Sequence, residues 1–279
     1  MLNFITGLMK YPIALTIAGS DSSGGAGIQA DIKTMSAIGV YAASVVTAIT
    51  AQNTTGVSGI QGISPDMVAK QIDAVFTDLH PSTVKIGMLY SEEIIMAVAE
   101  KLRTYKPEYV ILDPVMISTS GSRLISHEAI EAMKRELFPL SSVITPNRME
   151  AEYLSGIKIS DIANLEISAK NILSYGGLYV IVKGGHFKDT AMTDCLYDKN
   201  GLVECFKGNF VNTKNTHGTG CTFSSAIAAF LTLGNNIVNA IRLAKQYLQN
   251  ALECGADIDM GHGHGPVNHF FNPNKLRTI

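Results

Sequence analysis

A glycine-rich segment that carries a thiol, NTHGTGC at residues 215–221, directly precedes an alanine-rich stretch of helical character. Glycines at the start of a helix leave several backbone N–H groups unpaired at the positive end of the helix dipole. Such amides can hold a phosphoryl group while it develops charge, without the lysine of a Walker A motif, which this chain lacks. Gly218, Thr219 and Gly220 are therefore predicted to form an anion hole. The alternative is a helix cap that binds no ligand.

Cys221 closes this segment at the first turn of the expected helix. A thiol in that position has its anionic form stabilised, so we expect the pKa of Cys221 to be lowered. The thiolate could then take a proton from a bound alcohol as a general base. The alternative is a small buried residue without a chemical role.

Polar side chains lie at or just beyond the ends of several short apolar runs. Asp113, Asn147 and Lys183 each follow a run rich in Val and Ile, and Glu150 lies one helical turn beyond Asn147. The carboxyl ends of parallel strands meet at one edge of a sheet, where α/β proteins bind their ligands. Asp113, Asn147 and Glu150 could hold Mg²⁺ through water, and Lys183 could neutralise a phosphate. Each could also be a helix cap or a surface residue.

Two further glycine-rich segments invite other interpretations. Residues 24–30 loosely fit the dinucleotide fingerprint, but five residues separate the strand from the first glycine, and no acidic residue follows at the spacing that a ribose requires. We therefore favour a close-approach loop for a small ligand over a dehydrogenase, with an ordinary strand-to-helix turn as the alternative. Residues 261–266 with His269 could bind a metal, but their glycines and proline favour a tight closing loop.

The elements that must position these residues alternate along the chain. Apolar runs rich in Val and Ile alternate with stretches of helical period, which predicts a mostly parallel sheet with helices on both faces. The expected strands are residues 13–18, 45–49, 83–86, 109–112, 142–144 and 178–182. Val68, Ile72 and Phe76 give residues 65–78 an apolar helical stripe. Asn200-Gly201 predicts an antiparallel hairpin within residues 193–206, and two helices, 221–233 and 238–253, are expected to close the chain.

Composition limits the class of protein. The 279 residues include 22 basic and 24 acidic side chains, so the net charge of −2 disfavours binding to nucleic acid. Hydrophobic residues make up 46% and charged ones 16%, which predicts one globular α/β domain, with residues 1–11 as a flexible extension. No secretory signal and no apolar run of about 20 residues is present, so we expect no membrane association and a cytoplasmic location. Four cysteines without a CxxC pair predict free thiols.

Several segments together resemble a known family. They are LTIAGSD at 15–21, GGAGIQAD at 24–31, AQNT at 51–54, KIGML at 85–89, DPVM at 113–116 and NTHGTGC at 215–221. From about residue 13 to 270 the chain resembles the hydroxymethylpyrimidine and phosphomethylpyrimidine kinases, members of the ribokinase-like superfamily. The resemblance implies an enzyme of thiamine biosynthesis that uses ATP and Mg²⁺. It would phosphorylate 4-amino-5-hydroxymethyl-2-methylpyrimidine and then the resulting monophosphate.

The resemblance also implies roles for individual residues. The pyrimidine would be held by Gly19, Ala26, Asp31, Gln52, Met88 and Val115. The nucleotide would be bound by Lys183, His217, Gly218 and Gly220. Catalysis would involve Gly218, Thr219, Gly220, Cys221 and Lys183. The Gln52 amide offers a donor and an acceptor to an aminopyrimidine edge, whereas Met88 and Val115 can pack against the ring.

Other functions remain open on the sequence. A pyridoxal or pyridoxine kinase would share the fold and the anion hole and differ only in its ring pocket. A non-catalytic module that binds the pyrimidine is the alternative from another class. The resemblance further implies a homodimer, and the segments 118–124 and 188–193 are candidate lids.

Overall fold

A central β-sheet organises the part of the chain that this computed structural model describes, residues 9–116, 125–184 and 192–278. Its strands are β1 (Ile13–Asp21), β2 (Tyr41–Asn53), β3 (Gly56–Gly62), β4 (Thr83–Ile86), β5 (Tyr109–Leu112), β6 (Val143–Ile144), β7 (Tyr179–Val182), β8 (Met192–Asp198) and β9 (Gly201–Gly208). The order across the sheet is β3-β2-β1-β4-β5-β6-β7-β8-β9. The strands from β2 to β7 in this order pair in parallel, whereas β3, β8 and β9 pair antiparallel.

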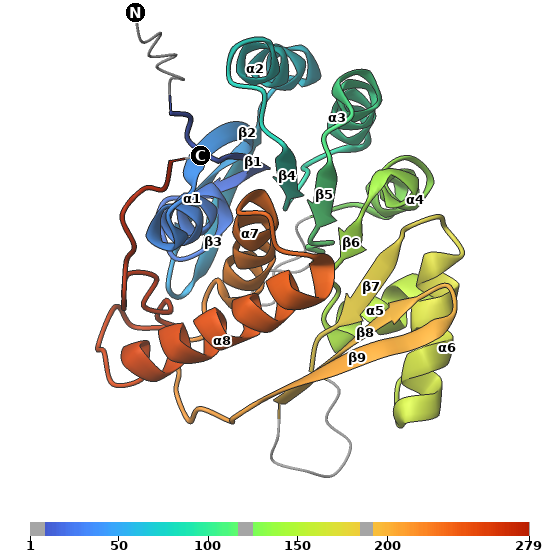
Figure 1. Ribbon diagram of the computed structural model, residues 1–279, viewed down its shortest axis with the longest axis vertical. Helices are drawn as coiled ribbons and strands as arrows, with labels where there is room; N and C mark the ends of the chain where they lie inside the picture. The colour runs from blue at the N-terminus through green and yellow to red at the C-terminus, as the bar shows by residue number, and fades with distance from the viewer. Residues whose placement is uncertain (1–8, 117–124, 185–191, 279) are drawn as a thin grey trace, which may run out of the picture.

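Helices cover both faces of the sheet (Figure 1). They are α1 (Gly27–Ile38), α2 (Pro65–Asp78), α3 (Glu92–Tyr105), α4 (His127–Glu136), the 3-10 turn η1 (Phe138–Leu140), α5 (Arg148–Ser155), α6 (Ile162–Leu173), α7 (Thr219–Thr232) and α8 (Ile237–Gly255). Helices α2 to α6 share one hydrophobic core with the sheet, and α1, α7 and α8 share the other. Helix α7 lies over the middle of the sheet, between α1 and α8.

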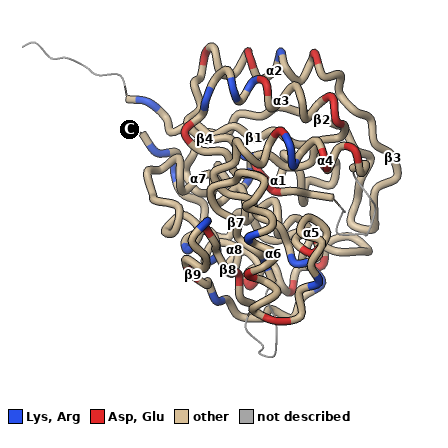
Figure 2. Tube along the Cα trace, turned by 90° about the vertical axis from the view of Figure 1, so that its right-hand side faces the viewer, with Lys and Arg blue, Asp and Glu red and all other residues tan. Residues whose placement is uncertain are grey.

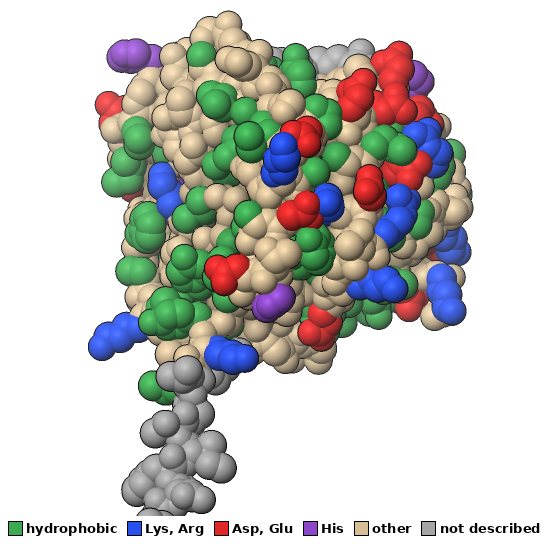
Figure 3. All heavy atoms as spheres, turned by 90° about the horizontal axis from the view of Figure 1, so that it is seen from above, with side chains coloured by type: hydrophobic (Ala, Val, Ile, Leu, Met, Phe, Trp, Pro, Cys, Tyr) green, Lys and Arg blue, Asp and Glu red, His purple; other side chains and the backbone are tan. Residues whose placement is uncertain are grey.

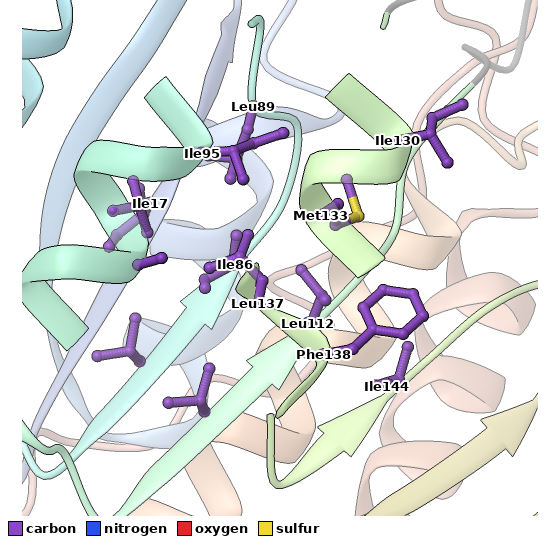
Figure 4. Close-up of a cluster of buried hydrophobic side chains, with 14 of the residues drawn as sticks. Ile17, Ile86, Leu89, Ile95, Leu112, Ile130, Met133, Leu137, Phe138 and Ile144 are labelled. Atoms are coloured by element: carbon purple, nitrogen blue, oxygen red, sulfur yellow. The ribbon is translucent and has the colours of Figure 1, made fainter. Parts of the chain in front are cut away.

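The central strands are apolar on both faces because each face is covered. Along β5, Val110 and Leu112 face the core under α2 to α6, whereas Ile111 faces the core under α7 and α8. Figure 4 shows the first of these cores, where strand and helix side chains interdigitate: Ile17, Ile86, Leu112 and Ile144 with Ile95, Met133, Leu137 and Phe138. This packing fixes where the strands end and therefore where the polar residues beyond them lie.

Most of the expected elements are confirmed. Helix α2 and strands β4 and β5 have the expected bounds, and the hairpin β8–β9 turns at the expected Asn200-Gly201. Strands β1 and β2 run several residues further than expected, to Asp21 and Asn53. Strand β3 was not expected, because GVSGIQG has no apolar run; it lies at the sheet edge, partly exposed.

The expectation that all the cysteines are free thiols is wrong for two of them. Cys195 and Cys205 form a disulfide between β8 and β9. They are direct partners in the antiparallel register, with Cα atoms 4.2 Å apart, so the hairpin itself brings the sulfurs together. Their separation of ten residues gave no such signal. Cys221 and Cys254 are free.

Charges of both signs are mixed over the outer helices. Figure 2 shows Lys and Arg interspersed with Asp and Glu along α2 and α3, where the pairs include Lys70 with Asp66 and Lys101 with Asp73. Figure 3 shows the face above these helices, with hydrophobic side chains scattered among the charged ones.

Several expectations concern segments that lie outside the described residues or next to their ends. Residues 1–8 of the expected extension lie outside them, and Tyr11 stacks on Tyr41 of β2 at a ring distance of 6.3 Å. The candidate lid 118–124 lies outside the described residues, as does most of 188–193, whose last two residues begin β8. None of the helices within the described ranges combines the length and the hydrophobicity that a bilayer span requires.

Candidate active site

The predicted anion hole forms the N-terminus of α7. Gly218 is its N-cap, with a φ of 80°, in the left-handed region that favours glycine. Among the described side chains, none caps this helix, so the first-turn amides of Gly220 and Cys221 are left for another acceptor. A Cβ atom on Gly218 would overlap the carbonyl oxygen of Gly25. Two glycine-rich loops that are far apart in the sequence therefore pack backbone against backbone at this point.

Lys183 and Asp113 border this helix N-terminus as an ion pair. Lys183 Nζ lies 3.1 Å from Asp113 Oδ1, and the lysine side chain keeps 16% of its surface exposed against 3% for the aspartate. A Cβ atom on Gly220 would lie 3.4 Å from Lys183 Nζ and 3.5 Å from Asp113 Oδ2. The absence of a side chain at Gly220 therefore leaves the ammonium group open towards the anion hole.

The two charges stabilise each other inside the protein. Burial by itself would raise the pKa of Asp113, but Lys183 and Lys85 outweigh it, and the pKa is lowered. Burial would likewise lower the pKa of Lys183, but Asp113 and Glu150 raise it. Both groups are therefore charged at neutral pH, which gives the site a cation for phosphate.

Asn147 and Glu150 form a capping box at the start of α5. Asn147 Oδ1 accepts from the Glu150 amide at 2.9 Å, and Glu150 Oε2 accepts from the Asn147 amide at 2.8 Å. A backbone bridge places Asn147 beside Lys183. Burial raises the pKa of Glu150 to about 7, with Lys183 opposing the rise.

The metal candidates come together but are already hydrogen-bonded. Asp113 accepts from Thr145, Lys183 and Ser224, and Asn147 and Glu150 serve the capping box. Within the described residues, no group of three His, Cys, Asp or Glu side chains is arranged to hold a metal ion. Mg²⁺ usually retains several waters and takes one or two carboxylates together with substrate phosphates. Asp113 and Glu150 therefore fit contact with Mg²⁺ through its bound waters better than direct coordination of the ion.

Cys221 lies half-buried in the first turn of α7. Burial raises the pKa of its thiol to about 11; Lys85 and the Gly27 amide oppose the rise, and the carboxylates of Asp31 and Asp113 add to it. The expected lowering of this pKa is therefore wrong. The helix N-terminus alone suggested a thiolate, but the surrounding protein and the two carboxylates outweigh it.

The expected pyrimidine side lies next to the anion hole. Gln52, near the end of β2, places its Nε2 atom 3.4 Å from His217 Nε2, one residue before Gly218. Gly19 is packed against Met88, since a Cβ atom there would lie 2.5 Å from Met88 Cε. The structure thus brings Gln52, Gly19 and Met88 to the same sheet edge as the anion hole.

Ala26 and Val115 also border this edge. The Ala26 amide donates to Asp21 Oδ2 at 2.8 Å, at the tip of the first glycine-rich loop. Val115 is half-buried just beyond Asp113, and its amide donates to the Asp113 carbonyl at 2.8 Å. Both residues therefore flank groups already placed in the site.

Asp21 is a site residue that the sequence did not single out. Its buried carboxylate accepts from Ser23, Gly25 and Ala26 and lies 2.8 Å from His217 Nε2. Burial would raise its pKa, but the hydrogen bonds of His217 and Ser23 lower it to about 2. Asp21 thus ties the first glycine-rich loop to the anion-hole segment. The available signal was Asp-Ser-Ser before glycines, a pattern typical of an Asx turn.

Asp31 corrects one expectation. Its side chain is fully buried and bonded to Lys85, Thr16 and Ser225, so no atom of the carboxylate is open to a pyrimidine ring. The resemblance implied a ring contact, whereas the structure places Asp31 beneath the site. Lys85, its partner, was not assigned a role from the sequence.

The glycine- and histidine-rich tail packs over this edge through its backbone. The His217 amide donates to the Gly265 carbonyl at 3.0 Å, and the His264 amide donates to the Thr54 carbonyl at 2.9 Å. His269 is buried against Thr222, and burial lowers its pKa to about 4. These bonds confirm the expected closing loop.

The chain is similar to known proteins over the part that contains these site residues. The family model described as phosphomethylpyrimidine kinase matches residues 21–268. A hydroxymethylpyrimidine/phosphomethylpyrimidine kinase of Rhizobium meliloti is 49% identical over 259 residues, which cover 92% of this chain and 97% of the relative. The thiamine biosynthesis bifunctional protein ThiED of Geobacter sulfurreducens is 47% identical over 94% of this chain, which spans 53% of that longer relative.

Solved structures confirm the expected ribokinase-like fold. The crystal structure of a phosphomethylpyrimidine kinase from Clostridium difficile 630 matches with a TM-score of 0.77 and 47% identity, over 86% of this chain and 99% of that one. A pyridoxal kinase of Staphylococcus aureus, in complex with AMP-PCP and pyridoxal, matches with a TM-score of 0.84 and 32% identity, over 94% of each chain. Given this coverage and identity, and a family match that runs from Asp21 past the anion hole, the chain belongs to the phosphomethylpyrimidine kinase family.

Proposed function

We propose that this protein uses ATP to phosphorylate 4-amino-5-hydroxymethyl-2-methylpyrimidine to its monophosphate and then to its diphosphate. The observation that carries the proposal is the junction at His217. There the anion-hole segment and Gln52, the expected pyrimidine contact, lie within 3.4 Å of each other. Relatives named for these two reactions are 45–49% identical to the chain, which supports the same substrates.

Phosphoryl transfer requires positioning and charge stabilisation more than covalent chemistry. The first-turn amides of Gly220 and Cys221 would hold the migrating phosphoryl group, at the turn that Gly218 allows, whereas the Thr219 amide already donates to the Thr216 carbonyl at 3.3 Å. His217 would border the nucleotide. The Lys183 ammonium group, beside Gly220, would neutralise charge that develops on its oxygens. The pairing with Asp113 holds this ammonium group in place before the substrates arrive.

Magnesium would be held through water by Asp113 and Glu150, with Asn147 fixing the Glu150 carboxylate through the capping box. A bound Mg²⁺ supplies charge neutralisation between the phosphates. Burial raises the pKa of Glu150 to about 7, and a nearby dication would favour its ionised form.

The pyrimidine would dock beside Gln52, whose amide can pair with both a donor and an acceptor on the ring edge. Met88 and Val115 would pack against the ring faces, while Gly19 and Ala26 allow the backbone to approach closely. Asp31 has no place in this contact set, because its carboxylate is enclosed.

Cys221 would serve the first transfer more than the second. The first acceptor is an alcohol that must lose a proton, whereas the second is already an anionic phosphate oxygen. With a pKa of about 11, the thiol is protonated at neutral pH in the free protein. A thiol that carries its proton cannot accept another, so Cys221 can act as the base only as the thiolate, after it has released its own proton to water.

We further propose a homodimer, on the strength of the family resemblance, and a cytoplasmic location. The Cys195–Cys205 disulfide is the structural feature that bears on the compartment, because reducing compartments rarely retain such bonds. Thiol counting on protein purified without reductant would give four free thiols per chain if the bond is absent in solution. Light scattering or sedimentation would give the oligomeric state.

The deciding experiment compares two alcohols, the aminopyrimidine and pyridoxal, each with ATP and Mg²⁺. We expect the pyrimidine to give ADP, a monophosphate and then a diphosphate, each identified by mass. Faster turnover of pyridoxal would make the protein a pyridoxal kinase instead. Binding of the pyrimidine without release of ADP above background would make it a non-catalytic binding module.

A further inference from the structure

A second buried ion pair lies beneath the first turns of α7, separate from the pair that faces the anion hole. Asp31 on α1 and Lys85 on β4 are both fully buried. Lys85 Nζ lies 3.0 Å and 2.9 Å from the two carboxylate oxygens. Thr16 Oγ1 on β1 donates to the same carboxylate at 2.6 Å, and Ser225 Oγ on α7 donates to it at 2.5 Å. One carboxylate thus joins four elements.

The sequence makes room for this arrangement. Thr16 and Lys85 are direct partners in the register of β1 and β4, so both side chains reach Asp31 from adjacent strands. A Cβ atom on Gly87 would lie 2.8 Å from Lys85 Nζ and 3.0 Å from the Cβ atom of Ala18. Glycine at position 87 therefore preserves the space that the buried ammonium group occupies.

Ser225 connects this buried centre to the residues of the anion hole. It lies four residues after Cys221, one helical turn further along the same face of α7. The neighbouring Ser224 hydroxyl lies 2.9 Å from the Gly220 carbonyl, 3.2 Å from the Cys221 carbonyl and 3.3 Å from Asp113 Oδ2. A hydroxyl has only one hydrogen to donate, so its link to Asp113 is shared. The Ser225–Asp31 bond is the shorter connection between α7 and the layer beneath.

We propose that Ser225, Asp31 and Lys85 act as positioning residues that fix the first turn of α7, with Gly220 and Cys221, against the end of β1 where the acceptor docks. The kinetic consequence rests on the function proposed above. A displacement of about 1 Å between reacting groups costs about a hundredfold in rate. Lys85, Asp31 and Asp113 also act electrostatically on the Cys221 thiol, which accepts from the Gly27 amide.

The test compares two buried serines. Ser225→Ala removes the bond to Asp31 and leaves both charges in place. It is expected to lower kcat about tenfold, the effect of one hydrogen bond to a charged group, while the KM for ATP and for the pyrimidine stays unchanged. Ser168→Ala on α6 is the matched control, since Ser168 is also fully buried but bonds Ala151 and Ser155 of α5 instead of linking α7 to an ion pair. Its kcat should equal that of the wild type.

A second readout needs no substrate. Iodoacetamide reacts with the two free thiols, and exposed Cys254 provides an internal reference for half-buried Cys221. We expect Ser225→Ala to raise the ratio of Cys221 to Cys254 alkylation several-fold, because the first turn of α7 is released, and Ser168→Ala to leave it unchanged. If the wild type phosphorylates neither pyrimidine, the proposed function fails, while this ratio still decides whether the tether exists.

A lowered melting temperature with unchanged kcat and an unchanged alkylation ratio would overturn the proposal, because the bond would then be only structural. If Ser225→Ala does not fold, Thr16→Val removes a different donor from the same carboxylate. The same fall in kcat is then expected, and a wild-type kcat for a folded Thr16→Val protein would also overturn the proposal.

Discussion

Two lysine–aspartate pairs contact the first turns of α7, and they differ in how much of the lysine side chain is exposed. Lys183 keeps 16% of its side-chain surface exposed and faces Gly220. Lys85 has none, and both oxygens of Asp31 accept from it. Each pair also contacts one of two consecutive serines, Ser224 with Asp113 and Ser225 with Asp31. The same residue types therefore serve two purposes within one helix turn.

This difference in exposure distinguishes a lysine that can bind phosphate from one that can only hold other residues in place. An ammonium group that retains some exposure can exchange part of its pairing for a phosphate at little cost. A fully buried one cannot be released without leaving an unpaired charge in the interior. We therefore expect changes at Lys183 to affect turnover first and changes at Lys85 to affect stability first.

The largest effect is expected from Lys183→Met. Without the cation beside the anion hole, kcat should fall about a thousandfold, the order that a cationic side chain contributes to phosphoryl transfer. Steady-state kinetics with ATP and the pyrimidine would measure this loss. Lys101→Met on α3 is the control, because its pair with Asp73 lies on the outer helices. A loss of less than tenfold in Lys183→Met would remove the distinction between the two pairs.

Lys85→Met should act on stability. Breaking a fully buried pair leaves Asp31 without its counter-charge, which is expected to lower the free energy of unfolding by about 3–5 kcal/mol. Urea unfolding would measure the loss. Lys70→Met breaks an exposed pair with Asp66 and should cost at most about 1 kcal/mol. Equal losses in the two variants would show that the buried pair contributes no more than a surface one.

Cys221 provides a further test, because members of both ion pairs act electrostatically on its thiol. Cys221→Ala should slow phosphorylation of the alcohol by about a hundredfold, the typical contribution of a general base, and affect the second transfer less. Separate assays with the purified alcohol and with its monophosphate would measure the two steps. An equal loss in both would exclude Cys221 as the base.

The smallest effect is expected at a third buried carboxylate, that of Asp21, which pairs with His217. Its pKa is lowered from 3.8 to about 2 in the folded protein, so its contribution to stability is complete above pH 3.8 and is lost as the pH falls towards 2. The loss should amount to about 2 kcal/mol. Unfolding experiments between pH 5 and pH 2 would measure it, and Asp21→Asn should flatten the profile. An unchanged slope in that variant would contradict the assignment.

Local patterns predicted most of the fold. The apolar period of residues 65–78 and the short runs of β4 and β5 depend only on near neighbours, and their bounds were predicted correctly. Strand β3 was missed because its stability depends on pairing with β2 and not on apolar residues of its own. The disulfide was missed for a similar reason, since it depends on the register of β8 and β9.

The site was predictable where a backbone motif defines it and not where several elements converge. Gly218 and Lys183 lie where strand ends and a helix start were expected to meet. The pKa of Cys221 was predicted with the wrong sign, because burial raises it and the carboxylates of Asp31 and Asp113, from other parts of the chain, add to the rise. Asp31 was placed against the substrate because the family resemblance implied a ring contact, although its carboxylate is fully buried and bonded to Lys85.

The contact between Gly218 and the Gly25 carbonyl limits how this enzyme could be redesigned. No side chain fits between the two loops, and Asp21 and His217 join the same two segments. Grafting a different acceptor loop around residues 22–27 would therefore disturb the phosphate-binding segment as well. Attempts to alter substrate choice here would succeed only by exchanging both loops together, as a single module.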